Sequence, residues 1–270
     1  MTSTRSLATD AVTVGYDDRV VVHDLSVSIP PGKVSVIVGA NACGKSTLLK
    51  SMARLLKPQS GAVLLDGRSI AEQPTREVAK TLGLLPQTPT APEGIVVADL
   101  VGRGRYPHRS FFGRWSDDDE RAVNEALTLT GILDLADRPV DELSGGQRQR
   151  VWIALALAQR TDVLLLDEPT TFLDVSHQVE VLDLLTDLNL ERGTTVVMVL
   201  HDLNLAARYA DHLFAVKDGR LHSEGPSSEV VTSEMVREVF GMESRIVIDE
   251  VSGTPLVLPV GRHHSAQLRL

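Results

Sequence analysis

The sequence is poor in cysteine and in long apolar runs. Its 270 residues include one cysteine, Cys43, which cannot form an internal disulfide, so nothing in it indicates an oxidising compartment. No apolar run approaches the roughly 20 residues that a membrane-spanning helix needs, and the N-terminal segment MTSTRSLATDAV lacks the apolar core of a signal peptide. We therefore expect cytosolic residence, with any membrane connection made through a partner.

An excess of positive charge is also absent. The formal net charge is −9 at pH 7, whereas nonspecific binding to nucleic acid normally requires a broad basic surface that neutralises phosphates. The sequence has no internal repeat, and its 43% hydrophobic content is that of an ordinary globular protein. We expect a sizeable core, in one large domain or two small ones, and no nucleic-acid partner.

The apolar pattern predicts a mostly parallel sheet with helices between its strands. Residues 34–38 form a mostly apolar, β-branched run typical of a strand buried on both faces, and a helical pattern follows over 46–56. Further strands are expected at 163–166 and 195–200, with a helix between them, and such alternation is typical of parallel sheets. Residues 20–29 are expected in a separate, antiparallel sheet.

Two segments lie outside this alternation. Residues 88–160 contain no convincing strand but carry helical patterns at 117–130 and 147–158, which indicates a helical insert. Near the C-terminus a short helix at 233–240 precedes two apolar runs around the turn 252–255, which can pair as a hairpin. We interpret this last part as a C-terminal extension.

A phosphate-binding loop is expected between the strand 34–38 and its following helix. The pattern is glycine, four residues, then Gly-Lys-Ser, and it comprises Gly39, Ala40, Asn41, Ala42, Cys43, Gly44, Lys45 and Ser46. Backbone N–H groups of the loop and of the first helical turn, which includes Thr47, are expected to point at phosphates, assisted by the helix dipole. Lys45 would reach the outer phosphates, and the Ser46 hydroxyl would ligate magnesium.

Two carboxylates follow the strand 163–166. Asp167 and Glu168 would emerge at the carboxyl edge of a parallel sheet, where ligands of such sheets bind. Asp167 is placed to hold Mg²⁺, and Glu168 to orient and deprotonate an attacking water. Alone, such a pair more often begins an ordinary loop, but a phosphate loop nearby favours the catalytic interpretation.

A capped helix start carries the strongest likeness to a known family. In the segment LSGGQRQ, Ser144 is expected to cap a helix while Gly145 and Gly146 leave backbone N–H groups open to an anion, with Gln147 following. The chain resembles the ATPase subunits of ABC transporters, for which LSGGQ is the defining signature. In that family the signature of one subunit covers the γ-phosphate of ATP held by the other, which implies a homodimer.

The resemblance also implies a fold and a domain division. The expected fold is α/β, a P-loop NTPase (RecA-like) core with a mostly parallel sheet, an N-terminal antiparallel β part and an inserted α-helical subdomain. The ATPase domain would occupy residues 12–243, with the helical signature subdomain at about 88–160. Residues 244–270 would form the extension.

Further positions match the family one by one. Tyr16 lies where an aromatic ring stacks on adenine, and Gln87 where a glutamine senses magnesium and links the core to the helical insert. His201 matches the switch histidine that contacts the γ-phosphate and positions the catalytic water. Leu173 and Asp174 match the loop that crosses the dimer interface.

The phosphate loop departs from the commoner family form. Ala40 and Ala42 stand where proline and glycine are usual. We expect Ala42 to exclude a left-handed backbone there, but nothing suggests that binding requires one. Cys43 is interpreted as a small loop residue, with oxidation or alkylation of an empty site as the alternative.

Several segments resemble the importer ATPases that serve iron chelates and vitamin B12, and most closely the ferric-siderophore members. They are residues 102–108, 168–174 and 252–255. The arginine and aromatic cluster at 103–114 is expected either to receive the coupling helix of a permease or to form a solvated basic loop. Heme, cobalamin and zinc remain alternative solutes.

The predicted function is an ATP-binding, ATP-hydrolysing importer subunit on the cytoplasmic face of the cell membrane, working with Mg²⁺. Its expected partners are a second copy, integral-membrane permease subunits and, indirectly, an extracytoplasmic solute-binding protein. A soluble ABC ATPase that moves nucleic acid would need long coiled coils or two ATPase domains in one chain. A regulatory module without turnover would require loss of Glu168 or His201, and both are present.

Overall fold

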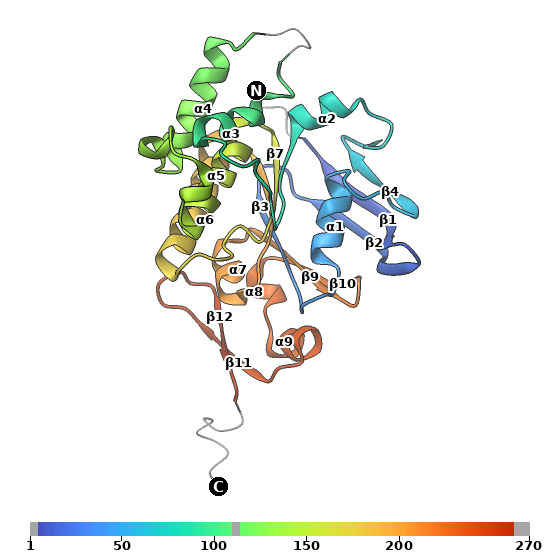
Figure 1. Cartoon of the computed structure of the whole chain (residues 1–270). Helices are drawn as coiled ribbons and strands as arrows, with labels where there is room; N and C mark the ends of the chain where they lie inside the picture. The colour runs from blue at the N-terminus through green and yellow to red at the C-terminus, as the bar shows by residue number, and fades with distance from the viewer. Residues whose placement is uncertain (1–4, 110–113, 262–270) are drawn as a thin grey trace.

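A six-stranded, mostly parallel sheet forms the centre of the computed structural model, which describes residues 5–109 and 114–261 (Figure 1). The strand order is β10-β9-β3-β8-β7-β6, and all neighbours are parallel except β10 with β9. The strands are β3 (Val34–Val38), β6 (Leu82–Leu85), β7 (Val163–Asp167), β8 (Thr195–Val199), β9 (His212–Lys217) and β10 (Arg220–Gly225). The predicted α/β fold is confirmed.

An antiparallel sheet lies beside the central one, as the sequence predicted. Its order is β2-β1-β4-β5, made by β1 (Leu7–Tyr16), β2 (Arg19–Ile29), β4 (Ser60–Leu65) and β5 (Arg68–Ser69). The first strand was not predicted. The register of β1 shifts between Thr9 and Val12, and Ala11 has a φ of 48°, so a bulge breaks the alternation of buried residues that would mark a strand.

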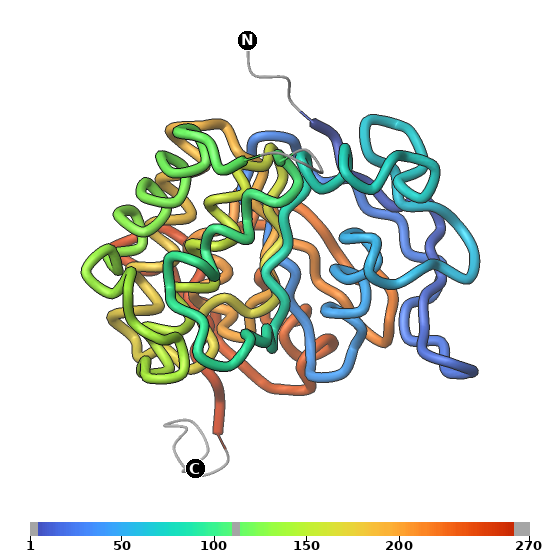
Figure 2. The backbone as a smooth tube through the Cα atoms, turned by 45° about the horizontal axis from the view of Figure 1, so that its top comes forward, coloured from blue at the N-terminus to red at the C-terminus, as the bar shows by residue number. Residues whose placement is uncertain are grey.

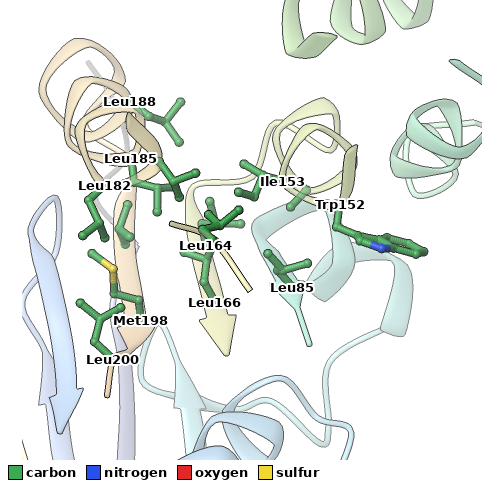
Figure 3. Close-up of a cluster of buried hydrophobic side chains, with 14 of the residues drawn as sticks. Leu85, Trp152, Ile153, Leu164, Leu166, Leu182, Leu185, Leu188, Met198 and Leu200 are labelled. Atoms are coloured by element: carbon green, nitrogen blue, oxygen red, sulfur yellow. The ribbon is translucent and has the colours of Figure 1, made fainter. Parts of the chain in front are cut away.

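The two faces of the central sheet serve two separate hydrophobic cores. Ile37, Leu165 and Val197 pack toward α1 (Lys45–Met52) and the antiparallel sheet. Their neighbours along the strands, including Leu164 and Met198, pack toward the long helices on the opposite face, as Figure 3 shows. Burial on both faces explains why these strands are continuous apolar runs instead of alternating ones.

Helices cover the second face of the central sheet, with the helical insert on the side away from the antiparallel sheet (Figure 2). The insert contains α3 (Val97–Gly102), α4 (Asp117–Leu129) and α5 (Gly145–Ala158), with 3₁₀ turns at Arg103–Arg105, Leu133–Leu135 and Val140–Glu142. The predicted helices at 117–130 and 147–158 are confirmed. The remaining helices are α2 (Thr75–Thr81), α6 (Val175–Arg192), α7 (Leu203–Tyr209), α8 (Ser227–Val230) and α9 (Ser233–Phe240).

The helix after the phosphate loop is shorter than predicted. It ends at Met52, and Arg54 then adopts a left-handed φ of 61°. Leu55, which extended the helical pattern in the sequence, is 66% exposed. The prediction to residue 56 was therefore wrong, because the apolar spacing continued into a surface turn.

The basic cluster of the insert contains a buried arginine that neither prediction anticipated. Arg105 is 3% exposed, and its guanidinium donates hydrogen bonds to Asp119, Asp118 and the Ala158 carbonyl, each at 2.9 Å. It therefore neither forms part of a solvated basic loop nor faces a partner. Residues 110–113 of the cluster lie outside the described residues.

The C-terminal hairpin predicted around residues 252–255 is present. Its strands β11 (Ser244–Ile248) and β12 (Pro255–Pro259) pair over five residues each and lie beyond α9 at the end of the molecule (Figure 1). Among the described residues, no helix is both long and apolar enough to cross a membrane.

Candidate functional site

The predicted site residues other than those of the LSGGQ segment gather around the ends of the central strands β3, β7 and β8. The carboxyl ends of parallel strands share one sheet edge, so the phosphate loop, Glu168 and His201 emerge side by side. They line one cavity of about 1650 Å³ together with Tyr16 and Gln87. This volume exceeds the roughly 300–1,000 Å³ typical of small-molecule sites, which leaves room for groups from another molecule.

The phosphate loop presents positive charge at a helix start. No side chain caps the N-terminus of α1, so its first N–H groups remain available to a ligand, and Lys45, Ser46 and Thr47 of this turn line the cavity. The Lys45 ammonium donates to the Gly39 carbonyl at 2.8 Å and to the Ala40 carbonyl at 2.9 Å. These bonds fold the lysine over the loop, where its charge can meet a phosphate.

The backbone of the loop is wound more tightly than its alanines suggested. Gly39 has a φ of 155°, and a Cβ built there would lie 2.2 Å from the Val216 carbonyl oxygen. Ala42 has a φ of 61°, so our expectation that it excludes a left-handed backbone was wrong. The preference of an alanine is worth only about 1–2 kcal/mol, which the surrounding loop can override.

Cys43 is a buried residue of the same loop. It is 7% exposed, and burial raises the pKa of its thiol. Since the thiolate is the reactive form, this environment disfavours oxidation and alkylation. The interpretation as a small loop residue therefore fits the structure better.

Ser46 and Asp167 form a site for a hard cation. The Ser46 hydroxyl donates to Asp167 Oδ1 at 2.8 Å, while the buried Asp167 Oδ2 has no hydrogen-bond partner. Burial raises the pKa of Asp167, although the hydrogen bond from Ser46 opposes that shift. A buried carboxylate oxygen without a partner beside a hydroxyl and a phosphate loop fits Mg²⁺, which prefers few protein oxygens completed by water and phosphate.

Glu168 and His201 face one another across the ends of β7 and β8. The Nε2 atom of His201 lies 2.5 Å from Glu168 Oε1, and Thr171 Oγ1 donates to Glu168 Oε2 at 3.1 Å. Glu168 itself is 7% exposed, whereas 46% of the His201 side chain is exposed. The pair thus combines a held carboxylate with an imidazole at the surface, an arrangement suited to water activation.

Tyr16 adds an exposed aromatic ring to the lining of the cavity. It ends β1 at the turn into β2, and 46% of its surface is exposed. A large aromatic left exposed beside a phosphate loop is suited to stacking on a nucleotide base.

The signature residues are in place but outside this cavity. The Ser144 Oγ accepts a hydrogen bond from the Gln147 N–H at 3.2 Å, and Gln147 Oε1 accepts from the Ser144 N–H at 3.1 Å, a complete capping box for α5. None of Ser144, Gly145, Gly146 and Gln147 is among the described residues that line the cavity. The structure therefore does not bring the signature to the phosphate loop of the same chain.

Two exposed apolar side chains, one on the loop after Glu168 and one at the start of α6, were missed by the sequence analysis. Phe172 is 81% exposed and Val175 76%, although Leu173 between them is buried. The loop is tied to the signature helix, because Gln149 Nε2 donates to the Pro169 carbonyl at 2.8 Å. Apolar residues on both sides of a buried leucine in a strand-to-helix loop were the available signal.

A second missed feature braces the phosphate loop from behind. The Gly219 N–H donates to the Cys43 carbonyl at 2.9 Å, and the His23 N–H donates to the Gly219 carbonyl at 2.8 Å. A Cβ at Gly219 would lie 2.0 Å from the Val21 carbonyl oxygen. Only glycine fits this position, but in the sequence it reads as an ordinary Asp-Gly turn.

Comparison with known proteins identifies the family. The family model described as ABC transporter matches residues 22–171, more than half of the chain. The chain is 55% identical over 257 residues to the probable siderophore transport system ATP-binding protein YusV of Bacillus subtilis, covering 95% of this chain and 94% of the relative. The chain belongs to the ABC transporter family. The resemblance inferred from the LSGGQ segment is thus confirmed.

Solved structures of ABC transporters share its fold. An inward-facing structure of a putative metal-chelate type ABC transporter superimposes with a TM-score of 0.81 at 28% identity, covering 96% of this chain and 98% of that one. The dimeric bacterial ABC transporter cassette MJ0796 gives a TM-score of 0.73 at 28% identity and covers 82% and 98% of the two chains.

Proposed function

We propose that this chain is the ATP-hydrolysing subunit of an ABC importer that energises uptake of an iron(III)-siderophore. The observation that carries the ATPase assignment is the convergence of the Lys45 loop, the Ser46–Asp167 pair and the Glu168–His201 pair on one cavity. The solute is inferred from the siderophore transport relative, which matches nearly the whole chain. Heme, cobalamin and metal ions are the competing solutes.

In the proposed mechanism each group has one task. Tyr16 stacks on adenine, and the loop N–H groups with Lys45 bind the phosphates. Ser46, Asp167 and Gln87 would hold Mg²⁺, which neutralises charge on the phosphate oxygens. Glu168 accepts the proton of the attacking water, and His201 keeps the carboxylate and water in line, since its Nε2 already contacts Glu168 at 2.5 Å.

The proposed working unit is a homodimer. The cavity has a phosphate loop but no signature of its own, and the capped start of α5 presents free N–H groups elsewhere on the surface. Phe172 lies exposed on the loop tied to that helix and Val175 lies exposed at the start of α6, as expected of residues that a second chain covers. The dimeric state of the MJ0796 cassette supports this arrangement.

The proposed location is the cytoplasmic face of the cell membrane, where the chain binds integral-membrane permease subunits. The helical insert offers an exposed aromatic surface for this contact, because Tyr106 is 58% and Trp115 45% exposed. An extracytoplasmic solute-binding protein would act through the permease and not touch this chain. No nucleic acid takes part.

Substitution of Glu168 by glutamine tests the ATPase assignment. The amide is isosteric with the carboxylate and preserves the packing, but it cannot accept the proton of the attacking water. ATP binding should therefore persist while hydrolysis slows by roughly 10²- to 10⁴-fold. Phosphate release and the dissociation constant of a fluorescent ATP analogue measure the two effects. Turnover near that of the wild type would remove Glu168 from the mechanism.

Uptake measurements test the solute. Cells lacking this chain should lose import of a labelled ferric siderophore and regain it with the wild-type gene but not with Glu168→Gln. Labelled hemin and cobalamin serve as the competing solutes in the same cells. Unchanged uptake of all ferric siderophores, or loss of hemin uptake alone, would contradict the siderophore assignment while leaving the ATPase assignment intact.

A further inference from the structure

The helix α7 begins two residues after His201. His201 is the second residue after β8. Asp202 caps α7 by accepting hydrogen bonds from the N–H groups of Asn204 and Leu205 at 2.8 and 2.9 Å. With only one residue between His201 and the first residue of α7, a movement of the helix start is passed to the histidine backbone.

Two hydrogen bonds join the C-terminal hairpin to the start of this helix. The Val257 N–H donates to Asn204 Oδ1 at 2.7 Å, and Asn204 Nδ2 donates to the Val257 carbonyl at 3.3 Å. The Asn204 side-chain amide thereby pairs with both the N–H and the carbonyl of Val257, as a residue of a neighbouring antiparallel strand does. Val257 is 4% exposed and packs in the same core as Ala206 and Ala207 of the helix.

A second contact holds the other end of the helix. Arg208 donates to Asp249 Oδ2 at 2.6 Å, and Asp249 also accepts from the Ser252 hydroxyl at 2.6 Å and from the Val251 N–H at 3.1 Å. The hydrogen bonds from Ser252 and Arg208 lower the pKa of Asp249. Asp249 therefore both stabilises the turn of the hairpin and pairs with Arg208 of α7.

The segment leading into the hairpin reaches the nucleotide cavity itself. Phe240, the last residue of α9, lines the cavity together with His201 and Glu168. Residues 233–259 thus touch the site at one point and hold the helix behind His201 at two others.

We propose that the hairpin 244–259 positions His201 against Glu168, with Asn204 as the positioning residue. The proposal rests on the ATPase function proposed above. In this proposal the rate of hydrolysis, and not the affinity for nucleotide, depends on the hydrogen bonds between the hairpin and α7. ATP turnover then becomes sensitive to whatever displaces the C-terminal part of the chain.

The decisive variant is Asn204→Leu, which keeps the side-chain size and removes both hydrogen bonds to Val257. In the full-length chain we expect kcat for ATP to fall about tenfold, while the dissociation constant for ATP changes less than twofold. Arg245→Ala is the matched control, since it alters an exposed residue of the same hairpin and should leave both constants unchanged. Asp249→Asn should lower kcat in the same direction if Asn204→Leu does not fold.

A double-mutant cycle separates positioning from general damage. If Asn204 acts through His201, adding Asn204→Leu to a His201→Ala chain should cost no further activity. An equal loss in both backgrounds, or an unchanged kcat in folded Asn204→Leu, would overturn the inference. A wild-type chain without ATP hydrolysis would instead refute the proposed function, so the two failures are distinguishable.

Discussion

At the residue scale, the phosphate loop shows that backbone geometry overrides side-chain preference. Ala42 adopts a left-handed φ of 61° and Gly39 a φ of 155°. The motif could be recognised from residue types alone, because the spacing of glycines, lysine and serine is what phosphate binding requires. The conformation of Ala42 could not, because it is imposed by the loop that surrounds it.

Substitutions at these two positions should have opposite effects on stability. Ala42→Gly relieves a left-handed alanine, so it should stabilise the fold by up to about 1 kcal/mol after the entropy cost of glycine. Gly39→Ala places a Cβ 2.2 Å from the Val216 carbonyl oxygen and should destabilise by about 2–5 kcal/mol. Urea unfolding measures both, and a Gly39→Ala chain as stable as the wild type would contradict the geometry.

At the scale of elements, the sequence predicted well wherever one physical rule decided the outcome. Strands buried on both faces were found as continuous apolar runs, and α5 was found from its helical pattern, with Ser144 as the expected cap. β1 was not predicted because the bulge at Ala11 breaks its alternation of buried residues. α1 was predicted too long because the exposed Leu55 continues the helical spacing. Burial of Arg105 could not be predicted, because its partners Asp118 and Asp119 belong to another element.

The buried Arg105 should hold the helical insert together. Arg105→Ala leaves Asp119, which is 4% exposed, without its guanidinium and should destabilise the protein by about 3–5 kcal/mol at pH 7. Arg121→Ala is the control, because its 3.6 Å contact with Asp118 is exposed and should be worth less than about 1 kcal/mol. Equal effects of the two substitutions would contradict a structural role for Arg105.

The same ion pair predicts a pH dependence. Burial opposes ionisation of Asp119, but the hydrogen bonds from Arg105 and Ser116 outweigh it and lower the folded-state pKa below the ordinary 3.8. Stability from this group is present above pH 3.8 and is lost as the pH falls through the lowered pKa. The difference between the wild type and Arg105→Ala should therefore shrink on acidification in this range.

At the scale of the whole molecule, the sequence predicted the part of the site that a single chain forms. Parallel strands carry the phosphate loop, Asp167, Glu168 and His201 to one edge, so their meeting follows from topology. The signature at Ser144 lies outside the cavity they line. In the proposed homodimer the signature therefore acts on the nucleotide bound by the other chain.

Mixing two defective subunits tests the proposed dimer. One chain carries Lys45→Ala and the other Ser144→Arg, with Glu168→Gln in both so that bound ATP is retained. Neither homodimer then has an intact site. In the heterodimer both lesions fall into one site, and the second site combines an intact phosphate loop with an intact helix start.

The central claim is that ATP is enclosed between the phosphate loop of one chain and the signature of another. The most direct measurement is the amount of ATP retained after rapid desalting of the heterodimer, once chromatography has confirmed that heterodimers form. The account predicts one retained ATP per heterodimer and almost none for either mutant alone. No gain of retained ATP on mixing would contradict it.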